Sequence, residues 1–570
     1  MTGARRRTRA AARTAVRRAA LAATLALAPV AWGQAAPHGA PAAPAGGPAG
    51  GAAGGVVEVA PGDDVVRIVA AAPAGTTFRF APGVYRLTTP IVPAPHDAFL
   101  GTPPDPDAAD ALARGGTILD GSVVLPPAER HGDVWTIDDP PPYDGDQHGS
   151  CMAAFLRCDY RQDLYLDGDP LLHVASTEHL GPGRWTYDFD ANRILIGEDP
   201  AGRTAALGVA EAALRGNANH VRIEDLTVRH FANPAQRGAI HAYGDRLPVT
   251  PGHAWEIRRV TADANHGVGL MAGYGAVIAD SRALRNGQLG IMSQGGQGTR
   301  VVRNEIAHNN LARFTFHWEG AGTKFRDTRD LVIRDNVVHH NHGPGIWCDR
   351  DNVGAHYVGN RVVGNASTGI FHEISYGALI EHNEVVDNGR YLGESAYAYV
   401  FGSGILVYNS PNVEVRNNVV VGNWNGINGL MHDRGTGLYG PWTLANLHVH
   451  DNVVHLPYHP RGMGPQDLPG QGGGVQAVAG ISQAGGLDGV YTDAANNRFE
   501  GNLYLLEDPN ADAWTWGDRG LTFDEWRTCG ADDHDHRYPG CAQDPGAQVR
   551  FVAPGSDVRA QAERWLEALR

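Results

Sequence analysis

The chain has 570 residues, and its 62 acidic against 47 basic side chains give a formal charge of −15. This charge excludes a protein that binds nucleic acid through a general basic face. Glycine accounts for 74 residues, about 13% against a usual value of about 7%, while 42% of the chain is hydrophobic, enough to form a large core. The composition therefore indicates a globular chain with many turns. Lys324 is its only lysine.

The first 35 residues are predicted to be a secretory signal peptide. Residues 1–18 hold seven arginines and no acid, residues 19–31 are apolar, and small residues suited to cleavage follow at 33–36. The apolar stretch is shorter than the roughly 20 residues that cross a bilayer, which disfavours the alternative of an uncleaved anchor. We expect secretion by the Sec or the twin-arginine route, no stable membrane insertion after cleavage, and a mature formal charge of −22.

The next segment and the cysteines fit an exported protein. Residues 36–55 are almost entirely Ala, Pro and Gly and are predicted to be a flexible linker. Proximity in the sequence suggests one disulfide between Cys151 and Cys158 and another between Cys529 and Cys541, which leaves Cys348 unpaired. Five buried thiols are the alternative.

A repeated pattern begins in the middle of the chain, where an asparagine recurs between two short apolar strands. The steps between successive asparagines are 32, 24, 23, 35 and 34 residues. A minimum of 23–24 with insertions in the longer steps is the period of a solenoid. A second asparagine follows four of these after five residues, and Gly-Ile usually comes next. The first set is Asn304, Asn336, Asn360, Asn383, Asn418 and Asn452, and the second is Asn341, Asn365, Asn388 and Asn423.

Each period thus contains three short strands separated by Asn or Gly turns, without the 3.6-residue spacing of helices. Three strands in about 23 residues describe one coil of a parallel β-helix. Stacked asparagines can hydrogen-bond along the turns and satisfy buried backbone groups. A β-propeller or a β-sandwich does not predict an asparagine at a fixed place in every period, so the pattern favours the β-helix.

Three stretches of the sequence resemble the secreted right-handed parallel β-helix proteins of the pectate-lyase-like superfamily. They are GTTFRFAPGVY at 75–85, TILDG at 117–121, and the Asn-Val coils, and the resemblance covers about residues 56–555. It implies an all-β fold, a right-handed single-stranded parallel β-helix. It implies the activity less sharply, because the superfamily includes polysaccharide lyases, glycoside hydrolases, epimerases and proteins without known catalysis.

The solenoid is expected to be interrupted once and capped at both ends. Residues 164–197 break the coil pattern, which indicates an inserted β-rich module, and helical patterns at 63–71 and 559–570 suggest end caps. The expected organisation is an N-terminal cap with the first coils at 56–122, the inserted module at 123–215, the main β-helix at 216–505 and a C-terminal capping region at 506–570.

The strand that follows each Gly-rich turn is predicted to present one face to the core and one to solvent. If Ile346 and Cys348 face inward, Trp347 and Asp349 face outward. A slip of one residue would exchange the two faces. By analogy, the other inward pairs are Ile370/His372, Ile405/Val407 and Phe316/Trp318, and the other outward pairs are Phe371/Glu373, Leu406/Tyr408 and His317/Glu319.

In this register three carboxylates, Glu319, Asp349 and Glu373, stack on successive coils about 4.8 Å apart. Because like charges repel at this distance, they should bind a cation or hold a proton. One interpretation is a Ca²⁺ site formed by Asp349, Glu373 and Asp351, with Asn352 as a further oxygen ligand. Another is the acid/base pair of a glycoside hydrolase, whose carboxyl separations of about 5 Å or about 6.5–9.5 Å both fit. A third is a solvated acidic strip.

A polysaccharide lyase that cleaves an acidic glycan by β-elimination is the function we predict. Such an enzyme neutralises the uronate carboxylate, here with Ca²⁺ or Arg350, and removes the adjacent proton, here with Lys324. The β-helix lyases resemble this in pairing acidic metal ligands with a Lys or Arg base, and the Asp-Asp and Gly-His-Gly signatures of the hydrolase families are missing from the sequence. A glycoside hydrolase and a non-catalytic glycan-binding protein are the alternatives. We expect a polysaccharide substrate, no nucleic-acid partner, no cofactor other than Ca²⁺, and a monomer. The predicted catalytic residues are Lys324, Glu319, Arg350 and His317, and the aromatic residues predicted to bind substrate are Trp347, Phe371 and Tyr408.

Overall fold

The computed structural model describes residues 54–103, 115–143, 147–244, 250–389, 400–457, 477–483, 485–508, 511–516, 519–528, 544, 546–553 and 556–569. The predicted signal peptide, nearly all of the predicted linker, and the predicted disulfide between Cys529 and Cys541 lie outside these residues. Within them, no helix has the length and apolar character needed to cross a membrane.

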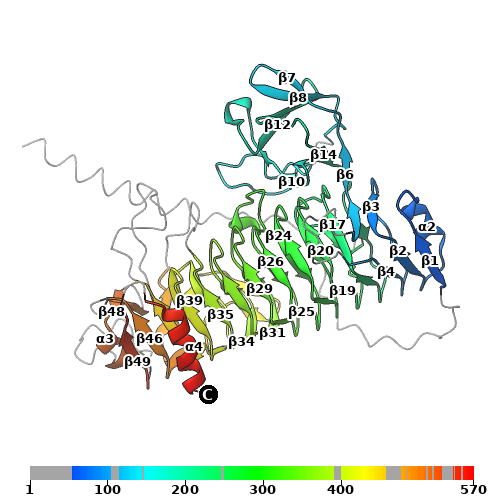
Figure 1. Cartoon of the computed structure of the whole chain (residues 1–570). Coiled ribbons are helices and arrows are strands. Elements are labelled where there is room, and N and C mark those ends of the chain that lie inside the picture. Colours follow the sequence, from blue (N-terminus) through cyan, green and yellow to red (C-terminus); the bar gives the residue numbers. More distant parts are fainter. Residues whose placement is uncertain are drawn as a thin grey trace, which may run out of the picture. The chain divides into compact units, whose positions relative to one another are not determined.

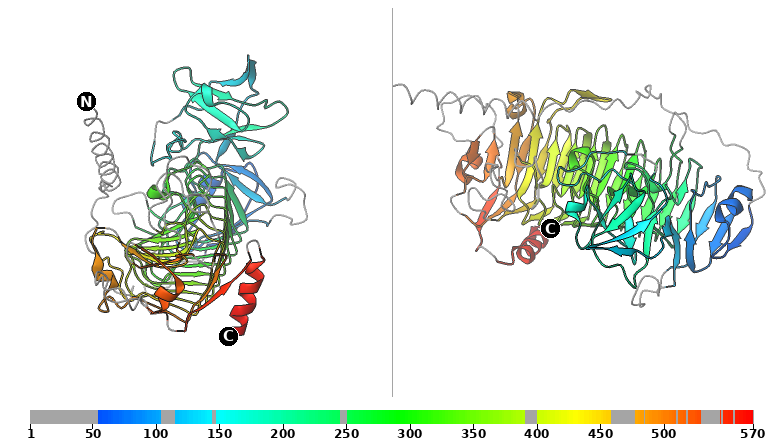
Figure 2. Two further views of the ribbon diagram at one scale, coloured as in Figure 1. Left: turned by 90° about the vertical axis from the view of Figure 1, so that its left-hand side faces the viewer. Right: turned by 90° about the horizontal axis from the view of Figure 1, so that it is seen from above.

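The main body is a parallel β-helix in which successive coils stack to form three long sheets (Figures 1 and 2). Sheet A has 13 strands, from β1 (Val56–Val59) to β45 (Arg498–Glu500), and sheet B has 13, from β3 (Gly83–Arg86) to β49 (Gln548–Phe551). Sheet C has 12 strands. In spatial order they are β15 (Leu214–Arg215), β18 (Gly238–His241), β21 (Val268–Met271), β24 (Leu289–Gln294), β27 (Thr323–Arg326), β30 (Ile346–Asp349), β33 (Ile370–Glu373), β36 (Ser403–Tyr408), β39 (Asn425–Met431), β44 (Ala479–Gln483), β47 (Trp514–Trp516) and β48 (Arg519–Leu521).

Two ladders of buried asparagines join the coils at their turns, as the sequence predicts. In the turn from sheet A to sheet B, Asn336 Oδ1 accepts the backbone N–H of Asn304 at 2.9 Å, and the N–H of Asn336 donates to Asn360 Oδ1 at 3.1 Å. Each side-chain amide also donates to a backbone carbonyl, so the buried polar groups of the turn are satisfied. The first ladder comprises Asn304, Asn336, Asn360, Asn383, Asn418, Asn452 and Asn502, and the second, between sheets B and C, comprises Asn265, Asn286, Asn309, Asn341, Asn365, Asn388 and Asn423.

The inward faces of the three sheets form one continuous hydrophobic core. The inward residues predicted for β30, β33 and β36 are confirmed: Ile346, Cys348, Ile370, Ile405 and Val407 are fully buried there. Cys348 is the free cysteine of the described residues. The alternation of strand residues therefore predicts the correct faces along this part of sheet C.

An inserted β-rich module follows β5 (Thr117–Asp120) of sheet B and ends before β15 of sheet C. Figure 1 labels several of its strands, among them β7, β8 and β12. It contains an antiparallel sheet of four strands and a mixed sheet of five, around its own hydrophobic core. The predicted disulfide between Cys151 and Cys158 lies in its loop. The strands are β6 (Ser122–Val124), β7 (Glu129–His131), β8 (Val134–Asp138), β9 (Leu164–Leu166), β10 (Asp169–Pro170), β11 (Leu172–His173), β12 (Arg184–Asp188), β13 (Arg193–Ile196) and β14 (Ala205–Gly208).

Both predicted terminal helices are present. Helix α2 (Val65–Ala71) buries Val65 and Val69 against the first coil. Helix α4 (Val558–Leu569) lies over the outward face of β38 (Val419–Val421) and β43 (Val453–Leu456) of sheet B, where Val558 and Ala562 are buried. The last coil is covered instead by α3 (Phe523–Thr528), whose Trp526 packs on Phe499. The described residues also contain three 3₁₀ helices: η1 (Thr177–His179), η2 (Phe316–Trp318) and η4 (Asp488–Tyr491).

Two buried histidines of sheet C lie on opposite faces of the sheet: His372 points into the core, and His241 faces outward beside Tyr243. His372 Nδ1 is 2.8 Å from the Tyr357 hydroxyl, and burial lowers the pKa of His372 to about 3. Burial, aided by the positive charges of Arg237 and Arg215, lowers the pKa of His241 to about 3 as well. Because the usual pKa of histidine is about 6.5, both imidazoles are neutral at pH 7.

The free energy of unfolding should therefore fall as the pH drops below about 6.5. Below pH 6.5 these histidines bind protons in the unfolded chain but stay neutral in the folded one. Their contribution to the free energy of unfolding is therefore complete above pH 6.5 and is lost between pH 6.5 and about 3. At pH 5 the loss is about 2 kcal/mol for each such histidine. Urea unfolding at pH 7 and pH 5 should show a smaller loss for His372→Gln than for the wild type. An equal loss in both proteins would contradict this explanation.

Candidate functional site

Four charged side chains follow one another across the outward face of sheet C and are called here the charged row. They are Lys324 on β27, Asp349 on β30, Glu373 on β33 and Arg434 in the segment after β39. Lys324 Nζ donates to Asp349 Oδ2 at 2.6 Å, and Arg434 Nη1 donates to Glu373 Oε1 at 2.8 Å. Asp349 and Glu373 are direct partners in the parallel ladder, as their predicted stacking requires. The charged row thus places two neighbouring carboxylates between two cations.

The two carboxylates differ in their surroundings. The Glu373 side chain is only 9% exposed, and its Oε2 accepts the indole N–H of Trp347 at 3.0 Å. Burial, and next the negative charge of Asp349, raises the pKa of Glu373, although Arg434 and Lys324 act against this. Asp349 is more exposed, and its Oδ1 has no hydrogen-bond partner among the described residues. Glu373 is therefore suited to hold a proton next to Asp349, whose carboxylate is paired with Lys324.

Aromatic rings form the layer beneath the charged row. The Trp347 and Phe371 rings stack with their centroids 5.5 Å apart, and Tyr408 continues the stack 6.2 Å from Phe371. Lys324 Nζ lies 3.2 Å from the centroid of the Trp347 ring, a cation–π contact. Each of the three rings is at most 5% exposed, because they pack on one another within an apolar cluster that also contains Met292, Leu406 and Leu430. The prediction that these rings are open platforms for sugars is wrong.

The charged row is connected to the inserted module by a further set of polar contacts. Glu319 Oε1 lies 3.9 Å from Lys324 Nζ, and Glu319 Oε2 accepts a hydrogen bond from Gln236 Nε2 at 2.6 Å. Gln236 Oε1 in turn lies 3.1 Å from Nε2 of His148, which belongs to the module's loop. A loop of the module therefore reaches the residues beside the charged row through Gln236, which the sequence did not indicate.

The strand register predicted upstream of β30 is wrong. Residues Phe316–Trp318 form the 3₁₀ helix η2 rather than a strand, and Glu319 ends it in the left-handed region with φ of 69°. The strand of this coil is β27, in which Phe325 pairs with Cys348, so Arg326 occupies the ladder position predicted for Glu319. Glu319 reaches Lys324 from the side instead of stacking on Asp349.

The aromatic residues of η2 also differ from their predicted places. Trp318 packs with Phe314 and the cysteines of the module's disulfide rather than in the main core. His317 is exposed, and its ring packs on Phe316 with the centroids 4.5 Å apart. His317 is thus not part of the charged row, and its predicted catalytic role has no support from the geometry.

Arg350 and Asp351 lie in the turn after β30, and neither belongs to the charged row. Arg350 is half-exposed, and its nearest carboxylates are Asp327 at 3.8 Å and Asp351 at 3.9 Å. Asp351 Oδ1 accepts hydrogen bonds from the Leu438 backbone N–H at 3.0 Å and from Trp442 Nε1 at 3.2 Å. The predicted role of Arg350 in neutralising a substrate beside Asp349 therefore has no support from the geometry.

The predicted Ca²⁺ site is not assembled either. Asn352 forms part of a third turn ladder, where its Oδ1 accepts the Thr328 N–H at 3.2 Å and its Nδ2 donates to Ser375 Oγ at 3.1 Å. Asp349 and Glu373 each contact a cationic side chain, and Asp351 lies apart from both in the turn. Because Lys324 and Arg434 already place positive charge beside Asp349 and Glu373, the arrangement does not fit a Ca²⁺ ion.

Comparison with known proteins places these features in a known fold. The family model described as the right-handed β-helix region matches residues 238–442, which contain the whole charged row. No curated protein sequence matches the chain. A complex of XylC with xylose is 14% identical with a TM-score of 0.54, over 85% of this chain and 82% of that one.

Two further solved structures have lower TM-scores. The mannuronan C-5 epimerase AlgE6 A-module of Azotobacter vinelandii is 14% identical with a TM-score of 0.45, over 85% of this chain and 93% of that one. A mannuronic acid-specific family 6 polysaccharide lyase from human gut microbiota is 9% identical with a TM-score of 0.39, over 90% of this chain and 94% of that one. At such identities a structural likeness concerns the fold alone. Together with the stacked coils of the structure, the family match shows that this chain is a right-handed parallel β-helix protein.

Proposed function

We propose that the protein is a carbohydrate-active enzyme that cleaves a glycan at the charged row. The observation that carries the proposal is the neighbouring pair Asp349 and Glu373, in which burial and the charge of Asp349 raise the pKa of Glu373. The fold is consistent with it, since the structure with a TM-score of 0.54 was solved in complex with xylose. Glycoside hydrolysis uses two carboxyl groups with different pKa values, so that one is protonated and acts as the acid while the other is ionised.

In the proposed hydrolysis the two carboxyl groups have different roles. Glu373 gives its proton to the oxygen that leaves when the glycosidic bond breaks. Asp349 assists the attack on the anomeric carbon, and water supplies the hydroxyl of one product and the proton that restores Glu373. Lys324, fully buried between Asp349 and the Trp347 ring, holds Asp349 in place. This positioning role replaces the role of free base predicted for Lys324 from the sequence.

The β-elimination predicted from the sequence remains the second candidate, and one observation favours it. The Tyr408 hydroxyl lies 2.7 Å from His432 Nδ1, and the Arg434 guanidinium is 5.1 Å from the centre of the Tyr408 ring. Burial is the main cause that lowers the pKa of His432 to about 4, and the positive charge of Arg434 adds to it. This imidazole is therefore neutral at pH 7. In such a reaction Arg434 leaves Glu373 to neutralise a uronate carboxylate, and the Tyr408–His432 pair removes the adjacent proton. The bond to the leaving oxygen then breaks, a carbon–carbon double bond forms, and the leaving oxygen takes up the proton from the pair.

Product analysis with the full chain on a panel of neutral and uronate polysaccharides tests the proposal. Hydrolysis gives new reducing ends without the ultraviolet absorbance of an unsaturated product, and Asp349→Asn should abolish it while Tyr408→Phe has little effect. Elimination gives that absorbance, and Tyr408→Phe should abolish it. A chelator should leave either activity unchanged, because neither reaction is assigned a Ca²⁺ ion. No cleavage across the panel would favour the non-catalytic glycan-binding alternative and overturn the proposal.

A further inference from the structure

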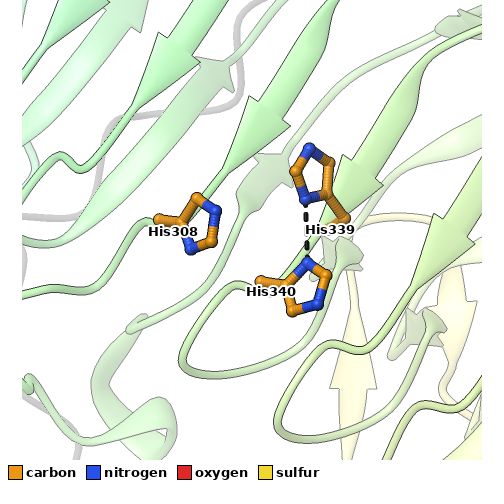
Figure 3. Close-up of side chains that lie close together, drawn as sticks. All are labelled: His308, His339 and His340. Atoms are coloured by element: carbon orange, nitrogen blue, oxygen red, sulfur yellow. Dashed lines mark hydrogen bonds between the residues drawn. The ribbon is translucent and has the colours of Figure 1, made fainter.

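A cluster of three histidines lies on sheet B, outside the charged row (Figure 3). His308 follows β26 (Glu305–Ala307), His339 ends β29 (Val337–His339), and His340 comes directly after it. The ring nitrogens of His339 and His340 are 2.9 Å apart at their Nδ1 atoms, and the His308 and His340 rings stack with centroids 5.4 Å apart. One ring nitrogen from each of the three lies within 4.8 Å of the other two. Among the described residues this is the only group of three possible metal-ligating side chains that meets this distance.

A carboxylate orients one of these imidazoles. Glu305 Oε1 lies 3.4 Å from His339 Nε2, and the other oxygen of Glu305 accepts a hydrogen bond from Arg282 Nε at 2.8 Å. With its proton on Nε2 toward Glu305, His339 turns the lone pair of Nδ1 toward His340. A histidine whose second nitrogen donates to a carboxylate in this way is the usual arrangement at protein metal sites.

The cluster also has space beside it. A cavity of about 510 Å³ is lined by His308, His340 and His342, together with residues of the next coil. Gly364 belongs to this lining, and a Cβ atom at that position would lie 3.2 Å from His340 Nε2. His308 and His340 are both exposed to solvent. An ion can therefore reach the rings and keep water molecules as further ligands.

We propose that His308, His339 and His340 bind one divalent transition-metal ion of the class that prefers imidazole nitrogen, represented by Zn²⁺ and Cu²⁺. Ligands about 2.05 Å from a tetrahedral Zn²⁺ ion are about 3.3 Å apart, so the observed 2.9 Å between the two Nδ1 atoms needs only a small adjustment. Because β26 and β29 are neighbours in sheet B, the ion joins two successive coils. Hard cations such as Ca²⁺ prefer oxygen and should not compete.

Titration of the chelator-treated full chain, without a histidine tag, tests the proposal by calorimetry with Zn²⁺ and by electron paramagnetic resonance with Cu²⁺. The wild type should bind one ion per chain, with nitrogen hyperfine coupling in the Cu²⁺ spectrum. The double variant His308→Ala/His340→Ala should lose this binding, and Glu305→Gln should weaken it about 10–100-fold. The matched control is His253→Ala, which removes an exposed histidine stacked on Tyr274 outside the cluster.

A second measurement separates the ion's effect from any effect on folding. Zn²⁺ should raise the Tm of the wild type and of His253→Ala, since an ion that binds only the folded chain stabilises it, and should leave the Tm of the double variant unchanged. Equal stoichiometry and affinity in the wild type and the double variant, or a Ca²⁺ response equal to that of Zn²⁺, overturns the proposal. Its result is independent of glycan cleavage, because the cluster and the charged row share no residue.

Discussion

Replacing Glu373 with glutamine should reduce glycan cleavage about 10²–10⁴-fold, the usual contribution of a general acid. The amide keeps the size of the side chain and can still accept the indole N–H of Trp347, which Glu373 Oε2 now accepts at 3.0 Å. It cannot deliver a proton to the leaving oxygen. The measurement is kcat for the full chain on the glycan that the panel identifies, with circular dichroism and Tm to show that the variant is folded.

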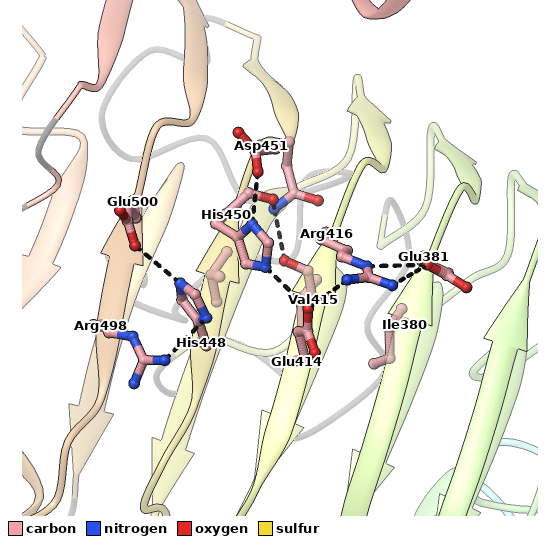
Figure 4. A network of polar contacts seen from close by, with 12 residues as sticks. Ile380, Glu381, Glu414, Val415, Arg416, His448, His450, Asp451, Arg498 and Glu500 are labelled. Carbon is pink, nitrogen blue, oxygen red and sulfur yellow. Dashed lines mark hydrogen bonds and ion pairs between the residues drawn. The ribbon is translucent and has the colours of Figure 1, made fainter. Parts of the chain in front are cut away.

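The matched control for this variant is Glu381→Gln on sheet A. Glu381 ends β34 (Tyr376–Glu381), in the same coil as Glu373, and like Glu373 it pairs with an arginine from later in the chain, Arg416, at 2.9 Å. Figure 4 shows it in a network with Glu414 and His450 on the outward face of sheet A. Glu381→Gln should leave kcat within about twofold of the wild type. If both glutamine variants lose activity equally, or if neither does, Glu373 is not the acid.

Replacing Asn360 with alanine should lower the free energy of unfolding by about 4 kcal/mol, because buried polar groups left without partners cost about 1–3 kcal/mol each. Asn360 Oδ1 accepts the backbone N–H of Asn336 at 3.1 Å, and Asn360 Nδ2 donates to the Ile333 carbonyl at 2.9 Å. Alanine supplies neither group, so a buried N–H and a buried C=O lose their partners in the middle of the ladder. Urea unfolding followed by circular dichroism measures the change.

Asp335→Asn is the control for the ladder. Asp335 precedes Asn336 in the same turn but is exposed, with φ of 54°, a conformation that asparagine also tolerates. Its substitution should change the free energy of unfolding by at most about 0.5 kcal/mol. A loss below about 1 kcal/mol for Asn360→Ala would mean that water or a shifted backbone satisfies the turn, and that the ladder is not a main source of stability.

The repeating part of the fold could be predicted because its causes are local. An asparagine at each tight turn satisfies its neighbours in the next coil, so Asn341, Asn365 and Asn388 recur at the coil period and form the second ladder. The inward and outward alternation on β30 and β33 follows from the strand geometry, so the stacking of Asp349 on Glu373 was also predictable.

The position of Glu319 could not be predicted from the same pattern, because an insertion interrupts its coil. Residues 316–319 read Phe-His-Trp-Glu and resemble the alternation of the later strands, yet they form η2 and the left-handed residue after it. The true strand, β27, begins at Thr323 after this insertion. The step of 32 residues between Asn304 and Asn336 did indicate extra residues in this coil, but spacing does not show on which side of the strand they lie.

The partners of the outward residues depend on segments that are distant in the sequence. Arg434 lies 61 residues beyond Glu373, and Gln236 lies 83 residues before Glu319. The apolar cluster that buries Trp347 and Phe371 likewise includes residues of several coils. No local pattern in the sequence indicates such contacts. The aromatic residues predicted to bind sugar are therefore a buried stack on the outward face of sheet C, and the carboxylates predicted to bind Ca²⁺ on β30 and β33 are ion-paired.

A crystal structure of Glu373→Gln with an oligosaccharide of the cleaved glycan tests the central claim most directly. We predict a sugar across the outward face of sheet C, with its glycosidic oxygen within about 3 Å of the replaced side chain at position 373. A sugar bound only on the inserted module or on sheet A, with no contact to Asp349 or to position 373, would contradict the assignment of the charged row as the site of cleavage.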